Sequence, residues 1–548
     1  MLKSCGPMLL ICLAVFPLLA RGATSPSSAG GSRYEDLVSF FRDWRSFQKP
    51  RLVDGVPDYG AAAMAAQQRE LETYRKRLAA IDPSGWPIPE QVDYQVVRAE
   101  LAGLDFDHRI LKPWANNPAF YVTVFGEESD QPAREGPFAA GAVEIWSYRF
   151  PLSAESAERM DAGIRAIPGL FAQAKTNLTG NGRDLWIYGA KAIKQQSGEL
   201  GKLAGKLGGA QPALEADVQR AKRATDEFAA WLDSKAPSKT GPSGVGIENY
   251  DWYLKNVQLV PYTWQEEVAL MESELARSKA LLAMEELKNA KLPPQEPVAS
   301  NAAEYDRRFH DAVTEYMAFL RDHEILTVKP YMDPALRARI GSYSPAPREF
   351  FSEVDYRDPE VMRTHGYHWF DKARMANEPP SSPIRREVLL YNIFNTRTEG
   401  HATCWEELMM QAGMFDARPR SRELVYILVA QRAARALGEL FMQGNRMTLD
   451  QAAAFACASV PRGWLRMDLG LVYFEQHLFL QQPGYGTSYL IGKMEIEKLL
   501  SERRQQQGDA FRMKAFMDDF NSRGLIPASL LRWEMTGRKA PEIERMLR

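Results

Sequence analysis

Residues 59–81 read YGAAAMAAQQRELETYRKRLAAI, and in this run alanine, leucine and methionine recur at helical spacing with charged residues between them. The run ends before Asp82-Pro83, because proline cannot continue a helix. A second run of the same kind, PEQVDYQVVRAELAGLDFDHRIL, covers residues 89–111. Both patterns predict amphipathic helices that bury one face against other helices.

The same pattern recurs along the chain. Further amphipathic runs cover 153–167, 186–207, 211–235, 262–290 and 301–323. Loops such as SKTGPSGVG and NAKLPPQEP separate them, and the alternating β-branched runs typical of strands are nearly absent. We therefore expect an all-α or nearly all-α fold that encloses a cleft, with the Pro-, Tyr- and Asp-rich residues 325–360 as a loop.

The first residues predict export. Lys3 precedes the apolar run GPMLLICLAVFPLLA, and small residues follow it. This order is typical of a secretory signal, so we predict a signal peptide at 1–23, cleaved between Ala20 and Ser25. The mature protein is then periplasmic or extracellular, without a membrane partner. An uncleaved membrane anchor is the alternative.

We divide the mature chain into an N-terminal helical region, 24–340, and a C-terminal helical region, 341–548, that carries the candidate site. The two regions could equally form one continuous domain. The formal net charge of −2 argues against nucleic acid as a partner. Cys404 and Cys457 are the cysteines outside the signal, and they could form one disulfide or lie unpaired within helices.

The C-terminal region concentrates residues with metal-binding chemistry. It contains THGYHWFD at 364–371 and NTRTEGHATCWEELMM at 395–410, and three of the seven histidines fall between positions 365 and 401. His365 and His368 are three apart, so on one helix they share a face and could bind one transition-metal ion. Glu399 and Glu406 are seven apart, also on one face. Glu399 could complete the ligand set, whereas His401 projects from the other side of that helix.

Each pair also has a structural interpretation. The two histidines could form a hydrogen-bonded core pair. The two glutamates could form buried ion pairs with nearby arginines, for which the candidates are Arg385, Arg386, Arg397, Arg420, Arg422, Arg432, Arg435 and Arg462. If a metal is bound, Glu406 could orient a ligand histidine or act as the general base.

The segment LQQPGYGTSYLIGKMEIEKL at 480–499 predicts a tight turn that enters a helix. The free N–H groups of that helix start, with Tyr485 or Tyr489, could bind a peptide carboxylate or stabilise an oxyanion. Alternatively, the glycines allow close packing of the backbone. The spacing of a P-loop and the G-x-S-x-G motif of serine hydrolases are both absent from the sequence.

These motifs resemble the DUF885 family of bacterial proteins. TEGHATCWEE is similar to the family segment E-G-W-A-x-Y-x-E, with Glu399, Gly400, Ala402 and Glu406 in register. QPGYGTSYLIG is similar to P-G-x-x-x-x-Y-x-x-G, matching Pro483, Gly484, Tyr489 and Gly492. The resemblance implies a mostly helical, peptidase-like fold and a zinc-dependent, peptidase-like activity.

The sequence lacks one motif that is typical of the family. Typical members carry H-E-A-x-P-G-H-H, whereas this chain has HGYHW at 365–369, with no glutamate after His365. Two hypotheses about the function therefore follow from the sequence. The first is an exported metal-dependent hydrolase acting on peptides or other small substrates, with His365, His368 and Glu399 as ligands and Glu406, Tyr485 and Tyr489 as catalytic residues. The second is a non-catalytic relative that binds such ligands in a retained helical cleft.

Overall fold

The computed structural model describes residues 32–548, so the predicted signal peptide lies outside the described residues. The described chain is nearly all-α, as the helical periodicity predicted. Its two sheets have only two strands each. They are an antiparallel pair, β1 (Leu52–Val53) and β2 (Val56–Pro57), and a parallel pair, β3 (Val124–Phe125) and β4 (Val143–Glu144).

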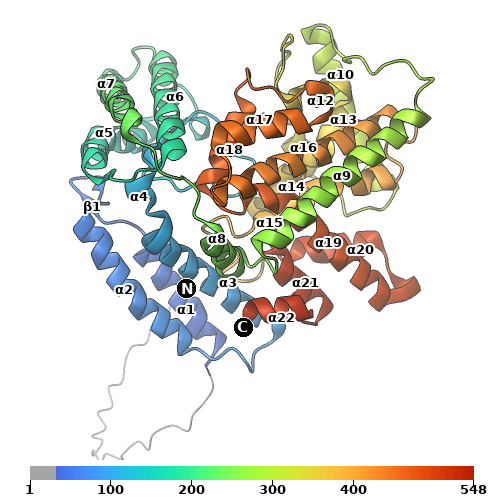
Figure 1. The fold of residues 1–548 in the computed structure, drawn as a ribbon, viewed down its shortest axis with the longest axis horizontal. Helices are drawn as coiled ribbons and strands as arrows, with labels where there is room; N and C mark the ends of the chain where they lie inside the picture. Colours follow the sequence, from blue (N-terminus) through green and yellow to red (C-terminus); the bar gives the residue numbers. More distant parts are fainter. Residues whose placement is uncertain (1–31) are drawn as a thin grey trace, which may run out of the picture.

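Three helices open the described chain and pack together at the lower left of Figure 1. They are α1 (Tyr34–Phe47), α2 (Ala61–Ala79) and α3 (Ile88–Phe106). Their apolar stripes, which include Leu37, Leu71 and Val97, are buried in the main hydrophobic core. A π-helical turn, η1 (Asp107–Leu111), continues α3, and α4 (Pro113–Asn116) follows it.

A second set of helices has a hydrophobic core of its own. It comprises α5 (Ala154–Asn177), α6 (Arg183–Leu207) and α7 (Pro212–Lys235), shown at the upper left of Figure 1. Buried residues such as Ile164, Ile193 and Phe228 fill the space between these helices. The predicted runs 186–207 and 211–235 match α6 and α7 closely.

The largest body of helices surrounds α16 (Arg420–Gln443), which is buried on almost every side. Its neighbours include α9 (Trp264–Lys288), α17 (Leu449–Ser459), α18 (Leu471–Gln481) and α19 (Tyr485–Gln507). Another helix of this body, α15 (Asn395–Gln411), packs most extensively on α19. A Cβ added to Gly400 would lie 2.3 Å from Cα of Gly492, so these two glycines allow the helix backbones to touch.

The remaining helices complete this body and the end of the chain. They are α8 (Ile247–Tyr253), α10 (Ala302–Asp322), α11 (Met332–Arg337), α12 (Phe350–Arg357), α13 (Pro359–His365), α14 (Tyr367–Asn377), α20 (Met513–Ser522), α21 (Ala528–Thr536) and α22 (Pro541–Leu547). Residues 325–360, predicted as a loop, therefore contain α11 and α12, both too short to show a clear period. Among residues 32–548, no helix is long and apolar enough to span a bilayer.

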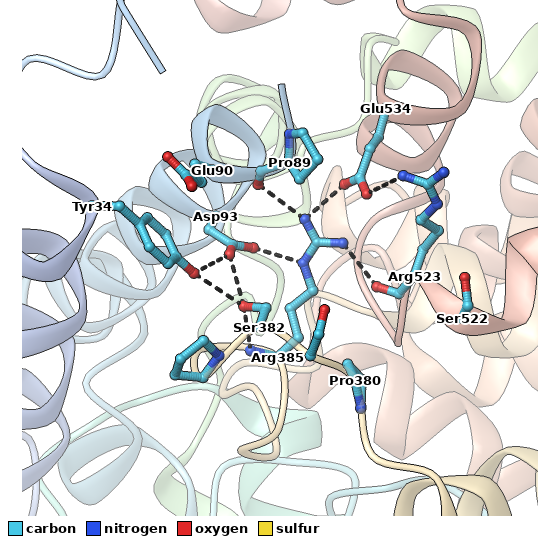
Figure 2. Close-up of a pocket in the computed structure, with 12 residues that line it drawn as sticks. Tyr34, Pro89, Glu90, Asp93, Pro380, Ser382, Arg385, Ser522, Arg523 and Glu534 are labelled. Carbon is cyan, nitrogen blue, oxygen red and sulfur yellow. Dashed lines mark hydrogen bonds and ion pairs between the residues drawn. The ribbon is translucent and has the colours of Figure 1, made fainter. Parts of the chain in front are cut away.

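The main core takes buried residues from both sides of position 340, from Leu37 to Met546. Arg385 adds a polar connection between the ends of the chain (Figure 2). Its Nε donates to Asp93 in α3 at 2.6 Å, and its Nη2 donates to Glu534 in α21 at 2.7 Å. The division at 340 stays a prediction, as does the enclosed cleft.

Candidate metal centre

His365 and His368 lie on two consecutive helices, and not on one helix as their spacing predicted. His365 is the last residue of α13, and His368 lies in the first turn of α14, with Gly366 at the junction. Their ring centroids are nevertheless 5.0 Å apart, in an edge-to-face arrangement. The break between the helices therefore keeps the two imidazoles adjacent.

A buried carboxylate orients His365. Oε1 of Glu406 is 3.0 Å from Nδ1 of His365. Arg432, on α16, donates from Nη2 and Nη1 to the two oxygens of Glu406 at 2.7 and 3.0 Å, and both side chains are fully buried. The glutamates could have formed buried ion pairs with nearby arginines. Glu406 does so, and its partner is Arg432.

The protonation of His365 follows from these surroundings. Burial lowers the pKa of His365; the Glu406 carboxylate opposes this shift, and the Arg432 guanidinium adds to it. The net direction favours a neutral imidazole, which is the form that binds metals.

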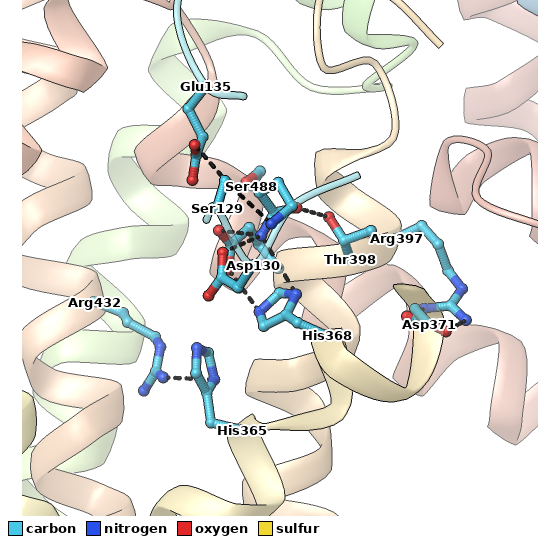
Figure 3. Close-up of polar contacts among 12 residues, drawn as sticks. Ser129, Asp130, Glu135, His365, His368, Asp371, Arg397, Thr398, Arg432 and Ser488 are labelled. Carbon is cyan, nitrogen blue, oxygen red and sulfur yellow. Dashed lines mark hydrogen bonds and ion pairs between the residues drawn. The ribbon is translucent and has the colours of Figure 1, made fainter. Parts of the chain in front are cut away.

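His368 faces Glu399 across a short gap (Figure 3 shows His368 and its surroundings). Nε2 of His368 and Oε2 of Glu399 are 3.3 Å apart. Neither atom has a hydrogen-bond partner within residues 32–548. Burial disfavours both charged forms, but each group stabilises the charge of the other. The carboxylates of Asp130 and Glu399 raise the pKa of His368 to about 9, and His368 lowers the pKa of Glu399 to about 2.

The other oxygen of Glu399 accepts two hydrogen bonds. The hydroxyl of Tyr485 donates to Oε1 at 2.6 Å, and the amide of Gln131 donates to it at 2.9 Å. The same amide nitrogen lies 3.3 Å from Nδ1 of His368, and the Gln131 carbonyl accepts from Thr398 at 2.7 Å. Gln131 therefore fixes His368 relative to Glu399.

Asp130, which no sequence motif indicated, completes the cluster. Single ligand atoms of Asp130, His365 and His368 all lie within 4.8 Å of one another. The loop that carries Asp130 is anchored to α14 by Lys372, whose Nζ contacts the Ser129 carbonyl and Glu128, both at 2.5 Å. An isolated aspartate in an acidic loop has no spacing that marks it as a ligand, so the sequence held no signal for it.

These residues fit a divalent transition metal. Two imidazoles with one or two carboxylates form a ligand set that is common for zinc. Two ligands of a tetrahedral ion with bonds of ~2.1 Å lie ~3.4 Å apart. The 3.3 Å gap between His368 Nε2 and Glu399 Oε2, with both atoms unpartnered in the described chain, is close to that spacing. Asp130, His365 and His368 line a cavity of about 210 Å³ together with Trp369 and Phe351.

A family model described as "Bacterial protein of unknown function (DUF885)" matches residues 47–382 and 367–535. The chain belongs to the DUF885 family. No curated protein matches it.

Two solved structures share the fold. One is described as "a putative lipoprotein of unknown function" from Shewanella oneidensis. It has 16% identity and a TM-score of 0.68, and the match covers 92% of this chain and 100% of that one. The other is described as "the putative lipoprotein" from Colwellia psychrerythraea. It has 14% identity and a TM-score of 0.65, and the match covers 92% of this chain and 99% of that one. At these identities the likeness concerns the fold alone.

The second DUF885 segment forms the predicted turn and helix start, but its N–H groups are already bound. Gly484 has a φ of +82° directly before α19. The carboxylate of Glu439 accepts from the N–H groups of Gly484 and Thr487 at 2.5 and 2.9 Å. A buried side chain thus takes these two donors, which favours the close-packing interpretation of the segment over a site for a substrate anion.

Tyr485 nevertheless contacts the metal-binding cluster of this DUF885 protein, and Tyr489 packs against two buried arginines. The Tyr485 hydroxyl contacts Glu399, and it lies 3.5 Å from Oε1 of Glu135. The Tyr489 ring packs against the guanidinium groups of Arg435 and Arg432, whose Cζ atoms are 5.1 and 5.8 Å from its centroid. The catalytic roles given to both tyrosines stay predictions.

Glu135 is a further residue that sequence reasoning missed. It lies in the same loop as Asp130, and Ser129 donates to it at 2.8 Å. Burial raises the pKa of Glu135 to about 7, with a further contribution from the Asp130 carboxylate. A carboxyl group with such a pKa can both accept and release a proton near neutral pH.

His401 and the two cysteines of the C-terminal region lie outside the metal-binding cluster. His401 is buried between the rings of Tyr367, Trp405 and Phe520, and its nitrogens have no hydrogen-bond partner in the described chain. Cys404 and Cys457 are unpaired.

Proposed function

We propose that this DUF885 protein is an exported, metal-dependent hydrolase that acts on peptides or similar small substrates. The observation that supports the proposal best is the meeting of Asp130, His365 and His368 at one cavity, with ligand atoms within 4.8 Å of one another. A bound zinc ion would lower the pKa of a water molecule and polarise the scissile carbonyl. Export rests on the N-terminal sequence pattern.

The proposal gives each residue of the cluster a separate task. Asp130, His365 and His368 hold the metal, and Glu399 lies close enough to His368 to add a carboxylate. Glu406 is a positioning residue, because Arg432 and His365 already occupy its oxygens. This geometry favours the orienting role for Glu406 over that of general base.

Glu135 takes the place of the glutamate that the H-E motif would supply. It is buried, its pKa is about 7, and its Oε1 lies 3.5 Å from the Tyr485 hydroxyl. Glu135 can therefore accept a proton from the attacking water and return it to the leaving amine. Tyr485 gives its single hydroxyl proton to Glu399, so its oxygen can accept a hydrogen bond from the substrate.

A binding protein without catalysis is the second candidate. The missing glutamate after His365 favours it, and so does the ion pair between His368 and Glu399, which satisfies both charges without a metal. Such a protein would retain the cavity and bind a peptide there without cleaving it.

Metal analysis of the purified protein separates the two candidates. We expect about one zinc per chain in the wild type, retained in His310→Ala and lost in His365→Ala/His368→Ala, because removal of two ligands leaves too few donors. His310 is the matched control, since it is an exposed histidine that contacts Arg337. Asp130→Asn should weaken zinc binding at least about tenfold, because an amide is a poorer ligand than a carboxylate.

Digestion of a peptide library by the same variants provides the second measurement. Cleavage by the wild type and by His310→Ala, but not by the histidine double variant, would support the hydrolase. A wild type that contains no zinc, recovers none on addition and cleaves no peptide would contradict it and support the binding protein.

A further inference from the structure

A second cavity, of about 310 Å³, lies where η1, the Tyr391 loop and the start of α4 meet. The loop that carries Asp130 and Glu135 continues into its wall as residues 136–140. The cavity is rich in aromatic side chains, which are Tyr59, Trp114, Phe120, Phe138, Tyr253 and Tyr391. Cavities of this size and composition commonly hold small ligands.

An isolated carboxyl group faces this aromatic lining. Asp107 begins the π-helical turn η1, and its side chain makes no hydrogen bond or ion pair with any residue in the range 32–548. Burial raises the pKa of Asp107 to about 8. Asp107 is half-buried, so its charged form is less well solvated than in water and would gain from a cationic partner. π-Helical turns are also common at functional sites.

A free donor lies on the same lining. The carbonyl of Gln482 accepts from the Gly136 N–H at 2.8 Å and from Asn392 at 3.1 Å. Its Nε2 is buried without a hydrogen-bond partner in the described part of the chain, and the residue is only 5% exposed. Gln482 thus offers one hydrogen bond to an occupant.

The Tyr391 loop has an unfavourable backbone conformation. Tyr391 and Asn392 have φ values of +57° and +47°, a region that non-glycine residues rarely adopt. Gln258 holds the Tyr391 carbonyl at 3.0 Å, and the Tyr391 ring lies so close to Gly103 that an added Cβ would be 2.4 Å from it. Backbone strain of this kind clusters at ligand sites.

The cations near the cavity do not neutralise Asp107. The Arg134 guanidinium stacks 4.0 Å from the Phe125 ring centroid, and its Nη2 donates to the Glu127 carbonyl at 2.7 Å. Lys49 is exposed to solvent. Asp107 therefore has no cationic partner among the described residues.

We propose that this cavity binds a small organic amine with an aromatic or other apolar body and a neighbouring hydrogen-bond acceptor. The ammonium group pairs with the Asp107 carboxylate and lies against the aromatic rings, which attract cations. The acceptor takes the free N–H of Gln482. The inference does not depend on the proposed hydrolase, because none of these groups belongs to the metal centre.

Two probes that differ by a single group test the proposal. Phenylalaninamide carries an amine, a carbonyl and a ring, whereas phenylpropanamide lacks only the amine. In calorimetric titrations of the wild type, we expect the amine to bind at least about tenfold more tightly. Asp107→Asn, whose side chain has nearly the same shape, should abolish that preference.

Two further variants locate the binding and guard against a folding defect. His368→Ala should leave the affinity for phenylalaninamide unchanged. If His368→Ala lost this affinity and Asp107→Asn kept it, the probe would bind at the metal centre, and the proposal would be overturned. Leu111→Phe adds bulk to the cavity wall and leaves the Asp107 carboxyl group in place, so it should weaken binding at least about tenfold even if Asp107→Asn does not fold. Equal affinities for the two probes, or no binding of either, would also refute the proposal.

Discussion

At the scale of single residues, a buried ion pair positions one histidine of the candidate metal centre. Arg432 binds Glu406 through both of its terminal nitrogens, and Glu406 in turn fixes the ring of His365. Partners of this kind commonly set the orientation and basicity of a ligand imidazole. The adjacent Glu407 has a different role, since it pairs with Arg277 at 2.9 Å and with Lys493 at 3.2 Å.

Substitution of Glu406 tests its positioning role. We expect Glu406→Gln to lower zinc affinity about 10- to 100-fold, because the amide holds the His365 ring less firmly. Competition against a coloured chelator measures this affinity. Glu407→Gln is the control and should leave it unchanged. Lost turnover with an unaltered zinc affinity would instead identify Glu406 as the general base.

At the scale of helices, the contact between α15 and α19 sets the distance between Glu399 and Tyr485. A Cβ on Gly492 would lie 2.1 Å from the carbonyl oxygen of Thr396, so no larger residue fits there without a shift of the helices. We expect Gly492→Ala to reduce the free energy of unfolding by about 1–3 kcal/mol. Urea denaturation measures the change.

A control on another helix completes this test. Gly198 lies on α6, and a Cβ added to it would meet no atom within 4 Å, so Gly198→Ala should be neutral or stabilising. If both alanine variants were equally stable, the close approach of α15 and α19 would not be a constraint.

The start of α19 is sensitive to pH through a buried acid pair. The Tyr250 hydroxyl lies 3.1 Å from Glu267 and 3.5 Å from Glu439, the carboxyl group that caps α19. Burial raises the pKa of Glu267 to about 8 and the pKa of Glu439 well above its usual value. A raised pKa in the folded state stabilises the protein below the unfolded pKa, and this stabilisation is lost as the pH rises through the folded value.

A neutral side chain should remove this sensitivity. We expect Glu267→Gln to be more stable than the wild type near pH ~8, with a difference that shrinks toward pH ~5, where Glu267 is protonated anyway. Thermal unfolding across this pH range measures the difference. The same substitution at the exposed Glu272, also on α9, should show no such trend. A constant difference at all pH values would exclude Glu267 as the titrating group.

At the scale of the whole molecule, Arg385 joins α3, near the start of the described chain, to α21, near its end. It binds Asp93 and Glu534, and its Nη1 donates to the Arg523 carbonyl at 2.8 Å (Figure 2). We expect Arg385→Met to lower the free energy of unfolding by about 3–5 kcal/mol, because buried carboxylates lose their partner. Chemical denaturation measures this. The exposed neighbour Arg386 is the control, and Arg386→Met should change the stability little; equal effects would contradict the explanation.

Helical periodicity predicted the architecture well, because each long helix buries one stripe, as α6, α7 and α10 do. It missed α11 and α12, which are about two turns or shorter. It also placed His365 and His368 on one helix, since nothing in their spacing shows the break at Gly366.

The candidate centre was predictable only in part. His365, His368, Glu399 and Glu406 meet in space, because α13, α14 and α15 pack together. Asp130 and Gln131 come from an irregular loop, which carries no periodic pattern to indicate what it contacts. Eight arginines were candidate partners for the glutamates, and only the packing of α16 against α15 selects Arg432.

The Asp130 loop also affects how the protein is made. Gln131 meets His368 across 237 positions of sequence, so the ribosome must synthesise most of the chain before this contact can form. Contacts between such distant positions form slowly, because closing a long loop costs entropy. A nascent or truncated chain that ends before α15 therefore lacks Glu399 and Glu406, and any hydrolytic activity begins only after most of the polypeptide has been made and folded.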